Sequence, residues 1–182
     1  MHRTPLLNML HAYQPYDRDE RDMYETLIRF VETENDCFDR SLLQGHITGS
    51  AWIVDYSHSK VLLTHHRKLD RWLQLGGHAD GDADILRVAL REAREESGID
   101  DIRPLSEDIF DVDVHPIPTR DAEPRHLHYD VRFLLEADAS SPLVVSSESK
   151  DLAWVSLSEL TQLTTEQSII RMMEKTLAHF KK

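Results

Sequence analysis

The chain has 182 residues and a formal net charge of −12, with 40% hydrophobic and 30% charged residues. This composition fits one folded domain, alone or with a small extension, and excludes a disordered chain. The acidic balance argues against a nucleic-acid partner, because nucleic acids bind surfaces rich in lysine and arginine. Small phosphorylated ligands remain open, because a bound metal ion can reverse the local sign of the charge.

The single cysteine, Cys37, excludes an intrachain disulfide and favours a reducing compartment. We expect it to be a small buried side chain rather than a nucleophile. The N-terminus lacks the long apolar segment of a signal peptide, and no apolar run reaches the roughly 20 residues that a membrane span needs. The sequence therefore predicts a cytoplasmic protein with no membrane partner.

Two helices are expected near the N-terminus. Residues 5–12 favour a short helix, and residues 18–35 favour a longer one, in which apolar side chains recur at helical spacing. Asp17 is a plausible N-cap for the second helix. We expect residues 1–45 to form a helical extension that packs on the main domain or on a partner subunit.

Further helices are expected in the rest of the chain. One follows a glycine-rich turn, with Asp82 or Asp84 as its N-cap and Gly98 as its left-handed stop. Its apolar stripe consists of Ile85, Leu86, Ala89, Leu90 and Ala93. Residues 156–160 favour a single turn, and residues 165–181 a terminal helix. The inward side chains expected for that helix are Ile169, Ile170, Met173 and Leu177.

Strand-like segments are interleaved with these helices. They are residues 47–54, 60–64, 72–75, 109–114, 127–135 and 152–155. A loop from Pro116 to Arg125 is expected to join two of them. Strands that alternate with helices predict a layered α/β domain with a mixed sheet over residues 46–182.

Three glutamates give the most informative pattern in the chain. Glu92, Glu95 and Glu96 stand at i, i+3 and i+4, so they share one face of a helix and repel one another. Mg²⁺ or Mn²⁺ would offset that repulsion, since both prefer carboxylate oxygens, and Mg²⁺ commonly also binds substrate phosphates. Arg91 could hold Glu95 in place. The alternative is a solvated helix face with ordinary charge pairs.

The residues around these glutamates resemble the Nudix box, G-x5-E-x7-R-E-U-x-E-E-x-G-U, where U is a bulky aliphatic residue. The matching residues are Gly77, Arg91, Glu92, Glu95, Glu96, Gly98 and Ile99. Ala83 replaces the first glutamate, and Ala93 stands at an aliphatic position. In the family that first glutamate braces the loop by pairing with the arginine, so Asp82 or Asp84 could substitute for it.

The resemblance implies a Nudix-like α/β/α sandwich with a mixed sheet, here with the N-terminal helical extension. It implies that Glu92, Glu95 and Glu96 are metal ligands, joined by the backbone carbonyl of Gly76. Family members often take the general base, or a further ligand, from a glutamate in a later loop. Glu148 is placed for that role, and its alternative is an exposed loop residue.

Several other side chains are candidates for substrate binding. Arg67 could contact substrate phosphates, or it could belong to a basic strand end. His126 and His128 share one face of a strand, and His78 lies in the box loop. These histidines are expected to bind substrate phosphate or a further metal, and the alternative is ordinary polar surface. Tryptophans are expected in the core rather than stacked on a base.

The resemblance implies a metal-dependent pyrophosphohydrolase that cleaves a nucleoside diphosphate linked to another moiety, with nucleotide sugars or ADP-ribose favoured. Three alternatives stay open: a nucleoside triphosphate pyrophosphatase, a non-catalytic nucleotide-binding regulator of the same fold, and an isomerase of a diphosphate substrate. The helical extension suggests a homodimer by analogy with nucleotide-sugar relatives.

Overall fold

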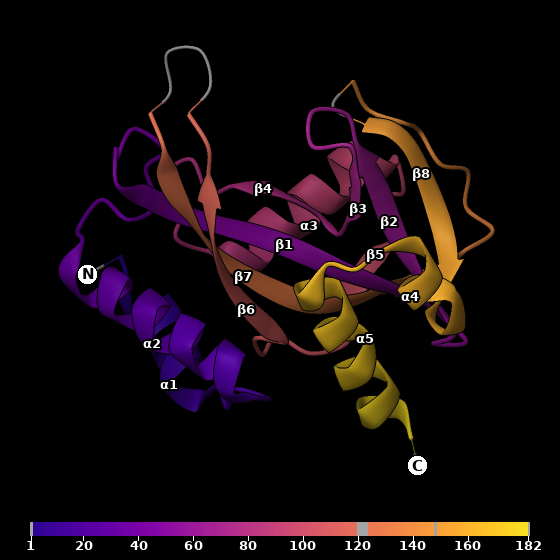
Figure 1. Ribbon diagram of the computed structural model, residues 1–182, viewed down its shortest axis with the longest axis horizontal. Coiled ribbons are helices and arrows are strands. Elements are labelled where there is room, and N and C mark those ends of the chain that lie inside the picture. Colours follow the sequence, from indigo (N-terminus) through magenta and orange to yellow (C-terminus); the bar gives the residue numbers. More distant parts are fainter. Residues whose placement is uncertain (1, 120–123, 148, 182) are drawn as a thin grey trace. The chain divides into compact units, whose positions relative to one another are not determined.

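The computed structural model describes residues 2–119, 124–147 and 149–181 (Figure 1). Glu148 therefore lies outside the described residues. The helices are α1 (Thr4–Ala12), α2 (Arg18–Thr33), α3 (Ile85–Ser97), α4 (Leu160–Leu163) and α5 (Gln167–Phe180), with a short 3₁₀ turn, η1 (Leu157–Glu159). Among the described helices, none has the length and apolar character needed to cross a membrane.

In the described part of the chain, eight strands form one sheet. They are β1 (Gly45–Asp55), β2 (Lys60–His66), β3 (Arg71–Leu73), β4 (Leu75–His78), β5 (Ile102–Pro104), β6 (Asp111–Ile117), β7 (His126–Ala137) and β8 (Ser149–Ser156). The main path of the sheet runs β3-β2-β1-β7-β5, and β4, β6 and β8 pair with β1, β7 and β2 respectively. The interleaved helices and strands confirm the α/β class.

The chain divides into two compact units. Unit 1 comprises Met1–Ser50, Gly77–Ala89 and Glu107–Phe133, and unit 2 comprises Ala51–Gly76, Leu90–Ser106 and Leu134–Lys182. Several elements, α3 among them, contribute residues to both units. Each unit is described by itself below.

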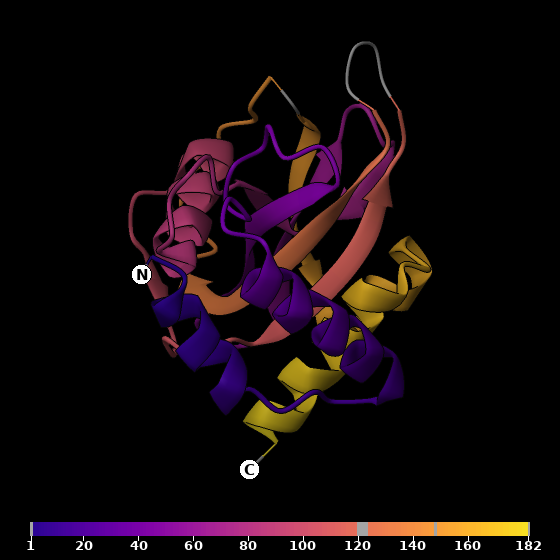
Figure 2. The same ribbon diagram turned by 90° about the vertical axis from the view of Figure 1, so that its left-hand side faces the viewer.

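In unit 1, helices α1 and α2 lie side by side, and α2 packs on β6 (Figures 1 and 2). Asp17 caps α2 as predicted, since its carboxylate accepts a hydrogen bond from the Glu20 backbone N–H at 2.7 Å. The buried Glu20 carboxylate accepts from the Val112 N–H at 3.2 Å and from the Tyr13 hydroxyl. Buried Glu20 thus ties the helical extension to β6.

A second polar network in unit 1 lies within the sheet. The guanidinium of Arg132, only 2% exposed, donates to three carboxylates on β6 and β7 at 2.7–3.1 Å. These are Asp111, Asp113 and Asp130. Burial alone would lower the pKa of Arg132, but the three carboxylates outweigh burial and raise it. Two hydroxyl groups of β1 extend this network. Thr48 and Ser50 each donate a hydrogen bond to Asp130 at 2.8 Å.

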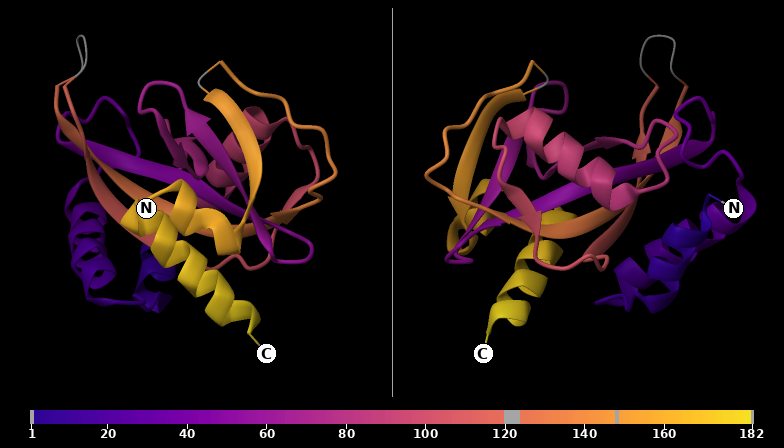
Figure 3. Two further views of the ribbon diagram at one scale, coloured as in Figure 1. Left: turned by 45° about the vertical axis from the view of Figure 1, so that its right-hand side comes forward. Right: turned by 180° about the vertical axis from the view of Figure 1, so that it is seen from behind.

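In unit 2, β2 pairs antiparallel with β1, β3 and β8 (Figure 3, where β8 is orange). The indole of Trp52, fully buried on β1, donates to Thr176 Oγ1 of α5 at 2.8 Å. The other two tryptophans, Trp72 and Trp154, are half-buried. The prediction of a core role is therefore confirmed most fully for Trp52.

The terminal helix turns a different face inward than the sequence predicted. Ile169 is buried as expected, but Met172 and Thr176 are also buried, while Leu177 is 40% exposed. An apolar stripe cannot identify Thr176, whose hydroxyl can be buried because it accepts from Trp52 and donates to the Met172 carbonyl.

Two further differences concern strands. The loop expected from Pro116 begins later, because Pro116 and Ile117 belong to β6, with Pro116 opposite Leu127 of β7. Among the described residues β6 pairs only with β7, and proline, which has no N–H to donate, is tolerated in a strand that lies at an edge. The short strand β5 was not predicted, since three residues are too few to show a period.

Candidate active site

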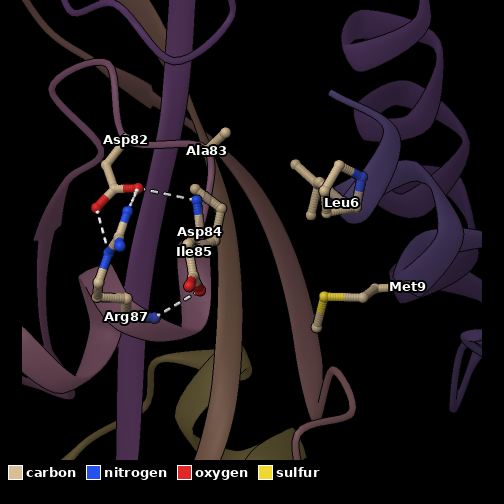
Figure 4. Close-up of a pocket in the computed structure, with 8 residues that line it drawn as sticks. Leu6, Met9, Asp82, Ala83, Asp84, Ile85 and Arg87 are labelled. Atoms are coloured by element: carbon tan, nitrogen blue, oxygen red, sulfur yellow. Dashed lines mark hydrogen bonds and ion pairs between the residues drawn. The ribbon is translucent and has the colours of Figure 1, made fainter. Parts of the chain in front are cut away.

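The loop that leads into α3 belongs to unit 1. Asp84 caps the helix, since its carboxylate accepts from the Arg87 N–H at 3.1 Å. Asp82 accepts a forked pair of hydrogen bonds from the Arg87 side chain, at 2.9 and 2.5 Å (Figure 4). Between them, Ala83 borders a hollow of about 400 Å³ that Leu6 and Met9 of α1 also line. Asp82 and Asp84 thus brace the loop through Arg87.

The acidic face of α3 lies in unit 2. The N–H of Gly76 donates to Glu96 Oε2 at 3.1 Å, and Arg91 Nη2 donates to Glu92 Oε1 at 2.7 Å. Arg91 thus holds Glu92, its neighbour in the chain, where the sequence suggested Glu95. Glu95 is exposed. Two of the three carboxylates are therefore held in place, and the third faces solvent.

These three side chains fit a divalent cation by their chemistry. Carboxylate oxygens are the hard ligands that Mg²⁺ and Mn²⁺ prefer, and Mg²⁺ is commonly bound through a few carboxylates together with substrate phosphates. The Gly76 N–H restrains the carboxylate of Glu96, and the guanidinium of Arg91 restrains that of Glu92. Neither group covers Glu95. The arrangement can hold a cation against a phosphorylated ligand.

The segment around position 148 is tied to α3 and to the Arg67 side chain within unit 2. The Val144 N–H donates to the carbonyl of Ser97, the last residue of α3, at 2.8 Å. Arg67 donates to the carbonyl of Ser147 at 3.0 Å and to that of Ser149 at 2.7 Å. The predicted phosphate-binding guanidinium is thus engaged with backbone on both sides of position 148.

The predicted histidines lie together in unit 1, and a fourth joins them. His78, His126 and His128 surround His46 of β1, with ring centroids 4.8–5.0 Å from its own. His46 was not predicted as a site residue, because a single histidine at the start of a strand gives no signal. Only the pairing of β1 with β4 and β7 places it beside the others.

Burial changes the protonation of two of these rings. Burial, reinforced by the neighbouring histidines, lowers the pKa of His46 to about 4 and that of His128 to about 2. Both rings are therefore neutral at pH 7. Burial also raises the pKa of the Cys37 thiol to about 11, which keeps it protonated and supports the prediction that it is not a nucleophile.

Comparison with known proteins decides the family, because the chain matches the NUDIX domain over residues 46–176. The chain belongs to the Nudix family. It is accordingly a hydrolase of phosphoric anhydride bonds, in a family that generally uses a divalent metal ion. No curated protein matches the chain.

Solved structures show the same Nudix fold. A *C. elegans* Ap4A hydrolase in a binary complex is 19% identical, with a TM-score of 0.55, covering 74% of this chain and 98% of that one. The *E. coli* dihydroneopterin triphosphate pyrophosphohydrolase is 17% identical, with a TM-score of 0.57 and coverages of 73% and 95%. The NUDIX domain of *Shewanella oneidensis* NrtR, complexed with ADP ribose, is 18% identical, with a TM-score of 0.53 and coverages of 84% and 97%.

The last glycine of the Nudix box has a strict steric requirement. Gly98 ends α3 with φ +73°, and a Cβ there would lie 2.7 Å from the Val144 side chain. We expect Gly98→Ala to lower the free energy of unfolding by more than the roughly 1–2 kcal/mol that a left-handed alanine costs, because the clash adds to the backbone strain. Urea denaturation measures the change.

Gly81→Ala is the matched control for this substitution. Gly81 has φ +85°, and among the described residues nothing lies within 4 Å of its Cβ position. The control therefore carries the backbone strain without the clash. Equal losses of stability in the two variants would show that contact with Val144 is unimportant.

Proposed function

We propose that the protein is a divalent-metal-dependent pyrophosphohydrolase that cleaves a nucleoside diphosphate linked to a second moiety, with ADP-ribose or a nucleotide sugar as substrate. The observation that carries the proposal is the acidic face of α3. There the Gly76 N–H holds the carboxylate of Glu96, Arg91 holds that of Glu92, and Glu95 stays exposed to a ligand.

The substrate class draws support from the names of the structural neighbours. ADP ribose, the ligand of the *S. oneidensis* domain, is a nucleoside diphosphate joined to a second ribose. The *E. coli* neighbour is named for a triphosphate substrate, which favours the second candidate, a nucleoside triphosphate pyrophosphatase. Hydrolysis of one phosphoric anhydride bond is common to both.

The start of the Nudix match supports the domain bounds that we propose. We assign residues 46–182 to the hydrolase domain and residues 1–45 to a helical extension, since the match begins at residue 46. The extension is held through the buried Glu20 and through Phe30, whose ring stacks on Tyr129 of β7 at 3.8 Å. It thus contributes to the packing of unit 1.

In the proposed mechanism, Glu92, Glu95 and Glu96 would hold the divalent ion, and the Gly76 carbonyl would be a further ligand. A cation held there would neutralise the diphosphate and lower the pKa of the attacking water. Hydrolysis adds the water oxygen to one phosphorus and breaks the bridging P–O bond, so that two phosphorylated products leave. Arg91 and the Gly76 N–H hold the carboxylates of Glu92 and Glu96 in place.

We assign acceptance of the water proton to Glu148. The backbone on both sides of it is held by Arg67, and the segment before it is bonded to the end of α3 through Val144 and Ser97. These bonds hold Ser147 and Ser149, its neighbours in the chain, within unit 2. A carboxylate is a suitable general base if it is near the water.

A substrate panel with Mg²⁺ or Mn²⁺ tests the proposal. We expect ADP-ribose or UDP-glucose to give two monophosphates, with kcat/KM at least about tenfold above that for nucleoside triphosphates, a difference of roughly 1.4 kcal/mol in transition-state binding. Release of pyrophosphate from triphosphates at a higher kcat/KM would favour the second candidate. Absence of cleavage across the panel would contradict both.

A further inference from the structure

Three imidazoles from three strands converge in unit 1. His46 of β1, His78 at the end of β4 and His128 of β7 offer ring nitrogens that all lie within 4.8 Å of one another. Their ring centroids are 4.8–5.1 Å apart. We call these three residues the histidine cluster, and none of them belongs to the Nudix box positions that bind metal in the proposed mechanism.

The cluster leaves polar atoms buried without a partner. His46 is 3% exposed, and among the described residues neither of its ring nitrogens has a hydrogen-bond partner. The same holds for Nε2 of His128. An unpaired buried polar atom costs about 1–3 kcal/mol, so native structures rarely keep several together unless something binds them.

We propose that the histidine cluster binds a zinc ion, or a transition-metal cation of the same type. Imidazole nitrogen is a ligand that Zn²⁺ accepts readily, whereas Mg²⁺ and Ca²⁺ prefer oxygen. Three protein nitrogens are a set found in zinc sites.

The chemistry of the cluster favours a cation over a substrate phosphate. Phosphate groups are usually bound by cationic side chains, and a phosphate is too large to enter where His46 lies, because His46 is only 3% exposed. Both ring nitrogens of His46 and Nε2 of His128 have no hydrogen-bond partner among the described residues, and imidazole nitrogen is the commonest metal ligand in proteins.

The spacing of the rings is close to that of a zinc site. In a tetrahedral site with Zn–N bonds of about 2.0–2.1 Å, ligand nitrogens lie about 3.4 Å apart. Zinc binding would therefore draw the three ring nitrogens together from the present 4.8 Å. His126 is placed to complete the site, with its ring centroid 5.0 Å from that of His46. Its Nδ1 lies 2.9 Å from the Pro124 carbonyl, which leaves Nε2 as the nitrogen for the metal.

Zinc at this position would join three strands. His46, His78 and His128 come from β1, β4 and β7 respectively. His78 directly follows Gly77, the first glycine of the Nudix box. With His126 as a fourth protein ligand the site would have no open position, which is typical of structural zinc. We therefore expect the ion to stabilise unit 1 rather than to take part in hydrolysis.

Zinc titration of the tag-free full-length protein tests this proposal. The chain is first treated with EDTA, dialysed and then titrated with Zn²⁺ against a chromogenic competing chelator. We expect one equivalent of zinc per chain, retained in excess Mg²⁺. X-ray absorption should show nitrogen ligands at about 2.0 Å. Failure to bind one equivalent, or a shell made of oxygen alone, would overturn the proposal.

Substitutions locate the site. His46→Asn and His128→Asn should each weaken zinc binding at least about 100-fold, since even the loss of a residue that only orients a ligand costs 10–100-fold. His78→Asn, at a half-buried position, serves as a third variant if the other two do not fold. His65→Asn is the matched control, because His65 belongs to unit 2, where it pairs with Asp70 and stacks on Trp72. Parent-like zinc affinity in all three cluster variants would contradict the assignment.

Discussion

Glu95→Gln and Glu96→Gln should each lower kcat for hydrolysis by at least about 100-fold, which is roughly 2.7 kcal/mol of transition-state stabilisation. Each substitution removes a charge that holds the divalent ion while keeping the size of the side chain. In Glu96→Gln the amide oxygen can still accept the hydrogen bond from the Gly76 N–H, which is 3.1 Å in the parent. The loss in kcat therefore measures the removed charge rather than a broken hydrogen bond with Gly76. Steady-state kinetics over a range of Mg²⁺ concentrations measures it.

Glu25→Gln is the control for these variants. Glu25 is an exposed glutamate of α2, in the other compact unit, so its substitution removes the same charge elsewhere. We expect parent kinetics from it. If Glu95→Gln and Glu96→Gln both hydrolyse substrate as fast as the control, the proposed mechanism is wrong.

Arg132→Ala should lower the free energy of unfolding by about 3–5 kcal/mol, because it leaves several carboxylates in the protein interior without their counter-charge. In the parent, Asp111 and Asp130 are 0% and 2% exposed and bond to the guanidinium at 3.1 and 2.7 Å. Burying a carboxylate without a partner is costly, since neither water nor a cation solvates it. Chemical denaturation at pH 7 measures the loss.

Two variants show whether this loss comes from the buried network. Arg87→Ala removes an exposed arginine that also forms an ion pair, with Asp82, and should leave the unfolding midpoint near that of the parent. Arg132→Lys keeps the charge but not the forked geometry, so its stability should fall between those of the parent and Arg132→Ala. A small loss in Arg132→Ala, similar to that in Arg87→Ala, would refute the explanation.

Elements with a local signal could be predicted from the sequence. Asp17 and Gly98 mark helix ends by a side-chain cap and a positive φ, and both are confirmed. The sequence did not predict features that depend on residues distant in the chain. The inward position of Thr176 needs the indole of Trp52, which is 124 residues away in the chain. The strand conformation of Pro116 needs β7 beside it.

The candidate site likewise has features that follow from local sequence and others that depend on distant contacts. The spacing of Glu92, Glu95 and Glu96 follows from helical periodicity alone, so the sequence could predict their common face. The partner of Glu96, the Gly76 N–H, comes from β4, 20 residues earlier in the chain. His46 gave no signal, because its meeting with His78 and His128 depends on the order of strands in the sheet. The role of Glu148 stays a prediction.

Manganese binding tests most directly the central claim, that the glutamates of α3 hold the catalytic cation. Mn²⁺ affinity can be measured by the EPR signal of the free ion, in a His128→Asn background that removes the histidine cluster. We expect the Glu95→Gln/Glu96→Gln double variant in that background to bind Mn²⁺ at least about tenfold more weakly, a difference of roughly 1.4 kcal/mol. Equal Mn²⁺ affinity with and without the two glutamates would contradict the account.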